Sequence, residues 1–401
     1  MFKSLNLKVI LFGFIFTFFS SFGQSYFLGL FNSSIRETLS ITHGQFGSIY
    51  ASATLCSSLL LIWVGKKIDD TNIFKFAFLV IILLSFSCFF FSKVSSIILL
   101  FIGIFLMRFS GQGMMSHTAT TTISRFFTKS RGKALSVGWF GLSFAEFILP
   151  VLMVYLLAVV EWQNLWLIFS VIILFFLPIT SFLLIKNLNL DSREVSSENK
   201  KEIAIKQWKR VEVIKDYRFY IISLNMLAMP WIFTGFAVFQ SFIQSSKGWG
   251  PYIIAQSFMC YSIFSVLTLF LSGFLIDKFT SRKLLIYMNI PLLLSVILLF
   301  YFDTPIIAFV FFGLVGISNG FSNILGSSTW AELYGVRHIG SIKSLTTALM
   351  VFATAFGTAL FGVLIDIGFT IENIAIVSGI YIFISLILLF SVRKKLNPII
   401  I

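Results

Sequence analysis

The sequence predicts an all-α integral membrane protein in which twelve transmembrane helices form two six-helix, pseudo-symmetric bundles. Three observations support this fold class: the composition, the number of long apolar runs and an internal repeat. Hydrophobic residues make up 58% of the 401 residues, charged residues make up only 11%, and the mean hydropathy is +0.96. A soluble fold could not bury that much apolar surface, so the solvent for most of this chain is lipid.

The apolar runs give the helix count. A bilayer core about 30 Å thick needs roughly 20 apolar residues per helix. Twelve runs reach about that length, at residues 9–31, 44–64, 73–92, 96–120, 133–157, 163–185, 219–242, 252–275, 284–301, 305–328, 341–365 and 374–391. In the first run Ser21-Phe22-Gly23 imitates a signal-peptide cleavage site, but we interpret the run as a helix because the repeat described below requires one.

The basic residues predict the orientation. If both termini face the cytoplasm, 26 of the 30 Lys and Arg residues lie on the cytoplasmic side, as the positive-inside rule demands of a plasma-membrane protein. The net charge of +14 would suggest nucleic acid in a soluble domain, but here the cations lie between apolar runs. We therefore expect lipid contact and no nucleic-acid partner.

An internal repeat predicts the domain organisation. Gly65 and Asp69 in the loop after the second run correspond to Gly273 and Asp277 after the eighth, at an offset of 208 residues, and Gly132 corresponds to Gly340 at the same offset. Parallel repeats of this kind are related by an axis along the membrane normal. We expect bundles at 1–186 and 217–401, joined by the hydrophilic linker 187–216, which includes some amphipathic helix.

These motifs resemble the major facilitator superfamily of secondary transporters, whose signature loop is G-x-x-x-D-[RK]-x-G-[RK]-[RK]. "GKKIDD" from Gly65 matches it in part, and "GFLIDKFTSRK" from Gly273 matches it more fully. The segment "RFFTKSRGKALSVG" (125–138) is similar to the loop after helix four in oxalate/formate antiporters and monocarboxylate porters. The resemblance implies that those branches bind carboxylates with cations deep in helices such as eight or eleven. In this chain helix eight has no such cation, and helix eleven has only Lys343 near its start.

The resemblance also implies an inner gate. Asp69 and Asp277 end helices two and eight, and we expect them to lie close to Arg131 and Arg337, at the N-terminal ends of helices five and eleven. A carboxylate at a helix N-terminus gains about 0.3–1 kcal/mol. The alternative is that these charges only set the topology.

Arg108 stands in the middle of an apolar run, where a charge costs roughly 3 kcal/mol and usually marks function. Its expected partner is Glu146, because both residues lie roughly 20 Å above the cytoplasmic ends of helices four and five. The repeat replaces them with Gly316 and Thr354, so we favour substrate binding or proton coupling over a structural ion pair. A buried carboxyl group changes its charge readily, as a proton-coupled cycle requires.

Other polar residues on helical faces predict the rest of the cavity. They are Gln24 on helix one, Gln112 on helix four, Ser257, Tyr261, Ser265 and Thr268 on helix eight, and Asn319, Asn323 and Ser327 on helix ten. Hydrogen bonding between helices is the alternative for each of them. At 100° per residue His117 lies opposite Arg108, which favours a packing or gating role.

The sequence favours a secondary transporter over an enzyme or a receptor. It has neither a catalytic or metal-binding constellation nor an ATP-binding G-x-x-x-x-G-K-[ST] loop, so we expect no metal, no cofactor and transport driven by gradients. The first choice of substrate is a small organic anion, such as a monocarboxylate, moved with protons or exchanged for a counter-solute. The alternative is proton-driven export of cationic or lipophilic compounds. A monomer is the expectation that the family gives.

Overall fold

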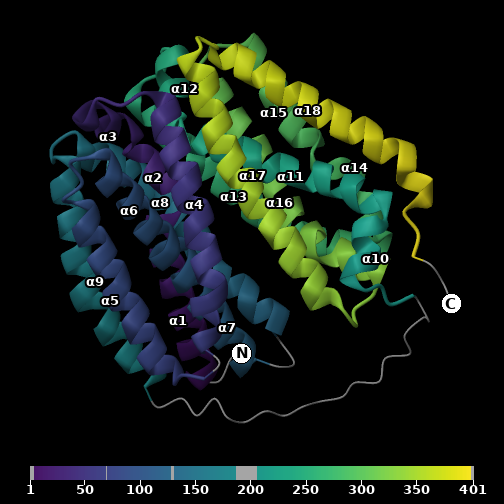
Figure 1. Cartoon of the computed structure of the whole chain (residues 1–401), viewed down its shortest axis with the longest axis horizontal. Helices are drawn as coiled ribbons and strands as arrows, with labels where there is room; N and C mark the ends of the chain where they lie inside the picture. The colour runs from purple at the N-terminus through teal and green to yellow at the C-terminus, as the bar shows by residue number, and fades with distance from the viewer. Residues whose placement is uncertain (1–3, 69, 128–130, 187–205, 399–401) are drawn as a thin grey trace. The chain divides into compact units, whose positions relative to one another are not determined.

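The computed structural model describes residues 4–68, 70–127, 131–186 and 206–398 (Figure 1). In this part of the chain eleven helices are long and apolar enough to cross a membrane, and the shorter apolar helix Leu7–Gly23 accompanies them. These described residues form no β-strand. The predicted all-α membrane fold is confirmed.

Within the described residues, the first compact unit, Met1–Ser196, has five helices long enough to cross a membrane and the shorter apolar helix Leu7–Gly23, which we count as the first of six spans. The first and fourth of these spans are interrupted. In chain order its elements are α1 (Ser4–Ser20), the 3-10 turn η1 (Ser21–Gly23), α2 (Ser25–Leu30), α3 (Asn32–Leu39), α4 (His43–Val64), the 3-10 turn η2 (Gly65–Ile68), α5 (Ile73–Phe91), α6 (Ile97–Met107), the π-helix η3 (Arg108–Met115), α7 (Ser116–Phe126), α8 (Arg131–Leu157) and α9 (Trp162–Ile185).

In the described part of the second compact unit, Ser197–Ile401, six helices are long and apolar enough to cross a membrane. Its elements are α10 (Arg210–Lys215), α11 (Tyr217–Val238), α12 (Gln240–Ser246), α13 (Pro251–Phe279), α14 (Ser281–Met288), α15 (Ile290–Tyr301), α16 (Ile306–Tyr334), α17 (Ile339–Asp366), α18 (Ile371–Val392) and the 3-10 turn η4 (Arg393–Lys395). Most of the predicted linker lies outside the described residues, so that boundary stays a prediction.

The helices repeat with the offset of 208 residues. Helices α4 and α13 begin at 43 and 251, α5 and α14 at 73 and 281, and α8 and α17 at 131 and 339. Helix pairs also recur: α1 packs on α8 as α11 packs on α17, α4 on α6 as α13 on α16, and α5 on α9 as α15 on α18. The two units therefore share one internal arrangement.

Local sequence explains where several helices begin. Thr42 and Gln45 form a capping box at the start of α4, and the side chains of Asn72 and Ser96 accept hydrogen bonds from the first backbone N–H groups of α5 and α6. Large apolar side chains face outward along the spans, for example Trp63 and Phe274, which are 75% and 76% exposed. Such exposed apolar surface is what a bilayer solvates.

Candidate functional site

The guanidinium of Arg108 is held by an interruption in the first span. The side chain is 2% exposed, and its Nη1 donates to the Gly23 carbonyl at 3.0 Å and to the Ser25 hydroxyl at 3.2 Å. The guanidinium carbon lies 5.3 Å from the centre of the Tyr50 ring, and the Tyr50 hydroxyl donates to Ser25 at 2.9 Å. Arg108 is therefore positioned by the broken first span and by α4.

The interruption frees the carbonyl that Arg108 uses. Ser21–Gly23 forms a 3-10 turn, and Gln24 follows with extended backbone at φ −81° and ψ 151°. Residues 21–23 are buried, so this irregular backbone is surrounded by protein rather than by lipid. In membrane transporters, discontinuous helices of this kind typically build the substrate site, because their backbone groups are available to ligands.

Two glycines let the interruption lie against the fourth span. A Cβ on Gly111 would stand 2.6 Å from the Gly23 backbone nitrogen, and a Cβ on Gly23 would meet the Met107 carbonyl. Only glycine allows two backbones to approach this closely. Gln24 and Gln112, both predicted cavity residues, are half-buried and each directly follows one of the two glycines along the chain.

The predicted ion pair between Arg108 and Glu146 is wrong. Among the described residues no ion pair involves either side chain, although Glu146 on α8 is only 8% exposed. Equal depth fixes a residue's position along the membrane normal, whereas pairing also requires the two side chains to face each other. Here Arg108 faces the interruption and α4.

One edge of the Arg108 guanidinium makes no hydrogen bond within the described residues. Nη1 donates both hydrogen bonds of the side chain, and Nε is buried without a hydrogen-bond partner. A buried donor left without a partner costs roughly 1–3 kcal/mol, and more when the group is charged. The planar edge formed by Nε and Nη2 matches the two oxygens of a carboxylate.

The fourth span is not a regular α-helix throughout. The prediction from periodicity, at 100° per residue, assumed that it was. Residues Arg108–Met115 form a π-helix, whose wider turns change the direction of every later side chain. His117 follows it, and its Nε2 lies 3.0 Å from the Gly65 carbonyl at the end of α4. This contact agrees with the packing role expected of His117, and the alternative gating role stays a prediction.

In the second unit, the side chain of Asn319 makes a hydrogen bond between two helices. Its Nδ2 donates to the Ser265 hydroxyl at 2.8 Å, across the α13–α16 contact. Gly316 and Gly320, spaced as in the G-x-x-x-G motif, face the backbones of Tyr261 and Ser265 and bring these helices together. Tyr261 is 2% exposed, and its ring stacks on Phe233 at 4.8 Å.

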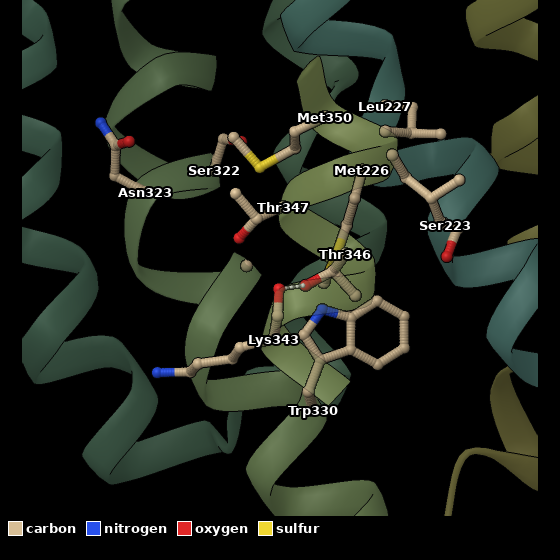
Figure 2. A pocket seen from close by; sticks show the side chains of 12 residues that line it. Ser223, Met226, Leu227, Ser322, Asn323, Trp330, Lys343, Thr346, Thr347 and Met350 are labelled. Carbon is tan, nitrogen blue, oxygen red and sulfur yellow. Dashed lines mark hydrogen bonds between the residues drawn. The ribbon is translucent and has the colours of Figure 1, made fainter. Parts of the chain in front are cut away.

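Asn323 lies in a cavity of about 220 Å³ between α11, α16 and α17. Figure 2 shows Asn323, Lys343, Thr346 and Thr347 around it, with Trp330 at one end. The Thr346 hydroxyl donates to the Lys343 carbonyl at 3.0 Å, so its proton is used in a hydrogen bond within α17. Lys343 thus shares a cavity with a predicted site residue.

The gate residues are described only in part. Asp69 lies outside the described residues, and so do the side chains of Asp277, Arg131 and Ser327. Arg337 is exposed, and its backbone N–H donates to the Gln207 side chain at 2.9 Å. The inner gate stays a prediction.

Sequence reasoning missed Ser25 and Tyr50, which contact Arg108. The signal was the Ser-Phe-Gly-Gln-Ser cluster at 21–25, because small and polar residues within an apolar run favour a break in a helix. The resemblance of 21–23 to a cleavage site came from the same small residues.

Comparisons with known proteins agree with this architecture. The family model described as Major Facilitator Superfamily matches residues 13–265 and 221–399. No curated protein matches the sequence at a significant level. A solved bacterial homolog of the human lysosomal transporter Spinster, inward-facing, aligns with a TM-score of 0.74 at 15% identity, covering 99% of this chain and 98% of that one.

A second solved structure, the nucleoside transporter NupG, aligns with a TM-score of 0.71 at 15% identity. The alignment covers 98% of this chain and 99% of that one. At such identities the likeness establishes the fold.

Proposed function

The chain belongs to the major facilitator superfamily, and we propose that it is a secondary transporter of a small organic anion, with monocarboxylates as the first candidates. Transport would proceed by alternating access, coupled to proton symport or to exchange. The proposal includes a plasma-membrane location with cytoplasmic termini, for which the distribution of Lys and Arg is the support.

One observation carries the choice of an anion. Arg108 is a buried cation with no carboxylate partner among the described residues, and its Nε has no hydrogen bond. A substrate carboxylate would supply both the missing charge and the missing acceptors. The hydrogen bonds to Gly23 and Ser25 hold the guanidinium in place before the substrate arrives, which lowers the cost of ordering it.

Ligand-induced stabilisation of the detergent-purified protein tests this choice. Small carboxylates should raise the unfolding temperature, since a ligand at 100 times its Kd stabilises the folded state by about 2.7 kcal/mol. The Arg108→Gln variant should lose this response, and Arg108→Lys should retain part of it, because an ammonium keeps the charge without the planar fork. Ser25→Ala is the graded comparison: it removes one of the two acceptors that position Arg108 but keeps the cation, so it should weaken the response less than Arg108→Gln does.

The response of Arg108→Gln to carboxylates decides whether Arg108 binds the anion. Equal carboxylate stabilisation in the wild type and in Arg108→Gln would remove Arg108 as the anchor. Uptake of a labelled carboxylate into proteoliposomes, measured with the same three variants, then tests transport itself. Substrate that binds without being taken up would contradict the proposed transport of that solute.

Export of cationic or lipophilic compounds is the second candidate, and the isolation of Glu146 favours it. The carboxyl group is buried without an ion pair among the described residues, so a cationic substrate could pair with it. In that case lipophilic cations should stabilise the wild type, and Glu146→Gln should abolish the effect while Arg108→Gln preserves it.

A further inference from the structure

Cationic side chains gather around a cavity at the C-terminal end of the second unit. The cavity has a volume of about 650 Å³ and lies between the end of α13, α14 and the residues after α18. Arg282, Lys283, Arg393 and Lys394 line it. Glu332 pairs with Arg282 at 3.4 Å, whereas the other three cations have no ion pair among the described residues. The cavity therefore has an excess of positive charge.

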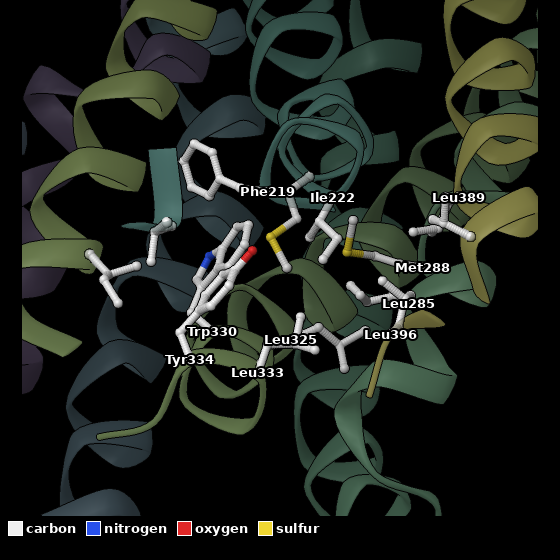
Figure 3. Close-up of a cluster of buried hydrophobic side chains, with 14 of the residues drawn as sticks. Phe219, Ile222, Leu285, Met288, Leu325, Trp330, Leu333, Tyr334, Leu389 and Leu396 are labelled. Atoms are coloured by element: carbon white, nitrogen blue, oxygen red, sulfur yellow. The ribbon is translucent and has the colours of Figure 1, made fainter. Parts of the chain in front are cut away.

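The chain after α18 is anchored, so these cations are held in place. Leu396 is 3% exposed and packs in a buried cluster with Leu285, as Figure 3 shows. Arg282 Nη1 donates to the Leu396 carbonyl at 2.7 Å, and Arg218 Nη1 donates to the Lys395 carbonyl at 3.1 Å. The segment that presents Arg393 and Lys394 is thus fixed by both apolar packing and hydrogen bonds.

An apolar groove continues from the cavity along the membrane span. It has a volume of about 400 Å³, is bounded by α14, α15 and α18, and shares Ile286 with the basic cavity. Its other lining residues include Ile290, Leu293 and Ile387. The Arg393 guanidinium lies 3.8 Å from the centre of the Phe390 ring, which lines the groove. A basic cavity and an apolar groove therefore adjoin at one place on the surface.

We propose that this composite site binds one anionic glycerophospholipid. The phosphate would occupy the cavity between Lys283, Arg393 and Lys394, and an acyl chain would lie in the groove between α15 and α18. The positive-inside rule assigns this end of the unit to the cytoplasmic side, where anionic lipids attract basic segments. A free phosphate would not use the groove, and a zwitterionic lipid would not neutralise the cations.

Native mass spectrometry and thermal unfolding of the full-length protein test the site. The probes are phosphatidylglycerol, phosphatidylcholine with the same chains, and glycerol phosphate. The variant Lys283→Gln/Arg393→Gln/Lys394→Gln should bind phosphatidylglycerol on the order of 100-fold more weakly, from about a fivefold loss per cation. The control variant removes three exposed cations elsewhere in the unit, at Lys209, Arg210 and Lys215, and should change binding less than about threefold.

Each other result overturns the proposal. Equal loss in both triple variants would mean diffuse attraction between basic residues and anionic lipid. Equal stabilisation by phosphatidylcholine would leave only the apolar groove, and saturation by glycerol phosphate at the same affinity would indicate a site for free phosphate. Substitution of Leu293→Asn, on the groove wall, should weaken phosphatidylglycerol binding without changing glycerol phosphate, and an unchanged lipid affinity would refute the acyl-chain position.

Discussion

The contact between Gly111 and Gly23 gives a prediction whose size follows from the structure. The substitution Gly111→Ala would place a methyl group 2.6 Å from the Gly23 nitrogen and 2.9 Å from its Cα. Both are backbone atoms in a buried turn, so they cannot move aside as a flexible side chain would. Overpacking against backbone atoms lies in the upper part of the usual range, at about 2–3 kcal/mol, and the higher helix propensity of alanine offsets about 1 kcal/mol of that. The expected net destabilisation is about 1–2 kcal/mol.

Thermal unfolding with and without ligand measures this effect. At about 2–4 °C per kcal/mol for a unit of this size, the unfolding temperature should fall by roughly 2–8 °C. Gly379→Ala is the matched control, because its methyl group would lie at an ordinary 3.6 Å from Val296. Displacing Gly23 also moves the Arg108 acceptor, so carboxylate binding should weaken in the first variant alone.

One result would refute the role assigned to the contact between Gly111 and Gly23. If Gly111→Ala unfolded at the same temperature as Gly379→Ala and bound ligand as the wild type does, the close approach would not position Arg108.

Three further variants test separate parts of the molecule. Glu146→Gln should remove the pH dependence of proteoliposome transport while substrate still binds, because the amide cannot exchange a proton; an unchanged pH profile excludes Glu146 as the proton carrier. Asn319→Ala should lower the free energy of unfolding by about 0.6–1.5 kcal/mol, because its hydrogen bond to Ser265 is lost, and should leave ligand affinity unchanged. A large loss of affinity would instead place Asn319 in the substrate site. Lys247→Met should cost about 1–3 kcal/mol in thermal unfolding, because its fully buried ammonium pairs with Asp303 at 2.6 Å and with Glu372 at 2.8 Å, and these carboxylates are 77% and 33% exposed. Wild-type stability in this variant would show that the two ion pairs contribute nothing.

Sequence patterns located the spans well because the bilayer imposes length and composition on every one of them. The predicted runs 44–64 and 133–157 correspond to α4 (His43–Val64) and to most of α8 (Arg131–Leu157). The repeat offset also predicted the relation between helix starts in the two units. Periodicity failed in the fourth span, because the π-helix at 108–115 changes the direction of the side chains after it.

By itself, the sequence determined the solvent, the apolar runs that form the spans, the twofold repeat and the position of Arg108 within an apolar run, since each follows from local composition or from spacing along the chain. Only the tertiary structure decided what Arg108 touches. Its acceptors are a backbone carbonyl and a hydroxyl about 85 residues away, and two glycines bring them within reach. Depth in the membrane can be counted along a helix, but the direction in which a side chain points depends on helix breaks and close backbone contacts. For that reason Arg108 contacts Gly23, Ser25 and Tyr50 instead of the predicted partner Glu146.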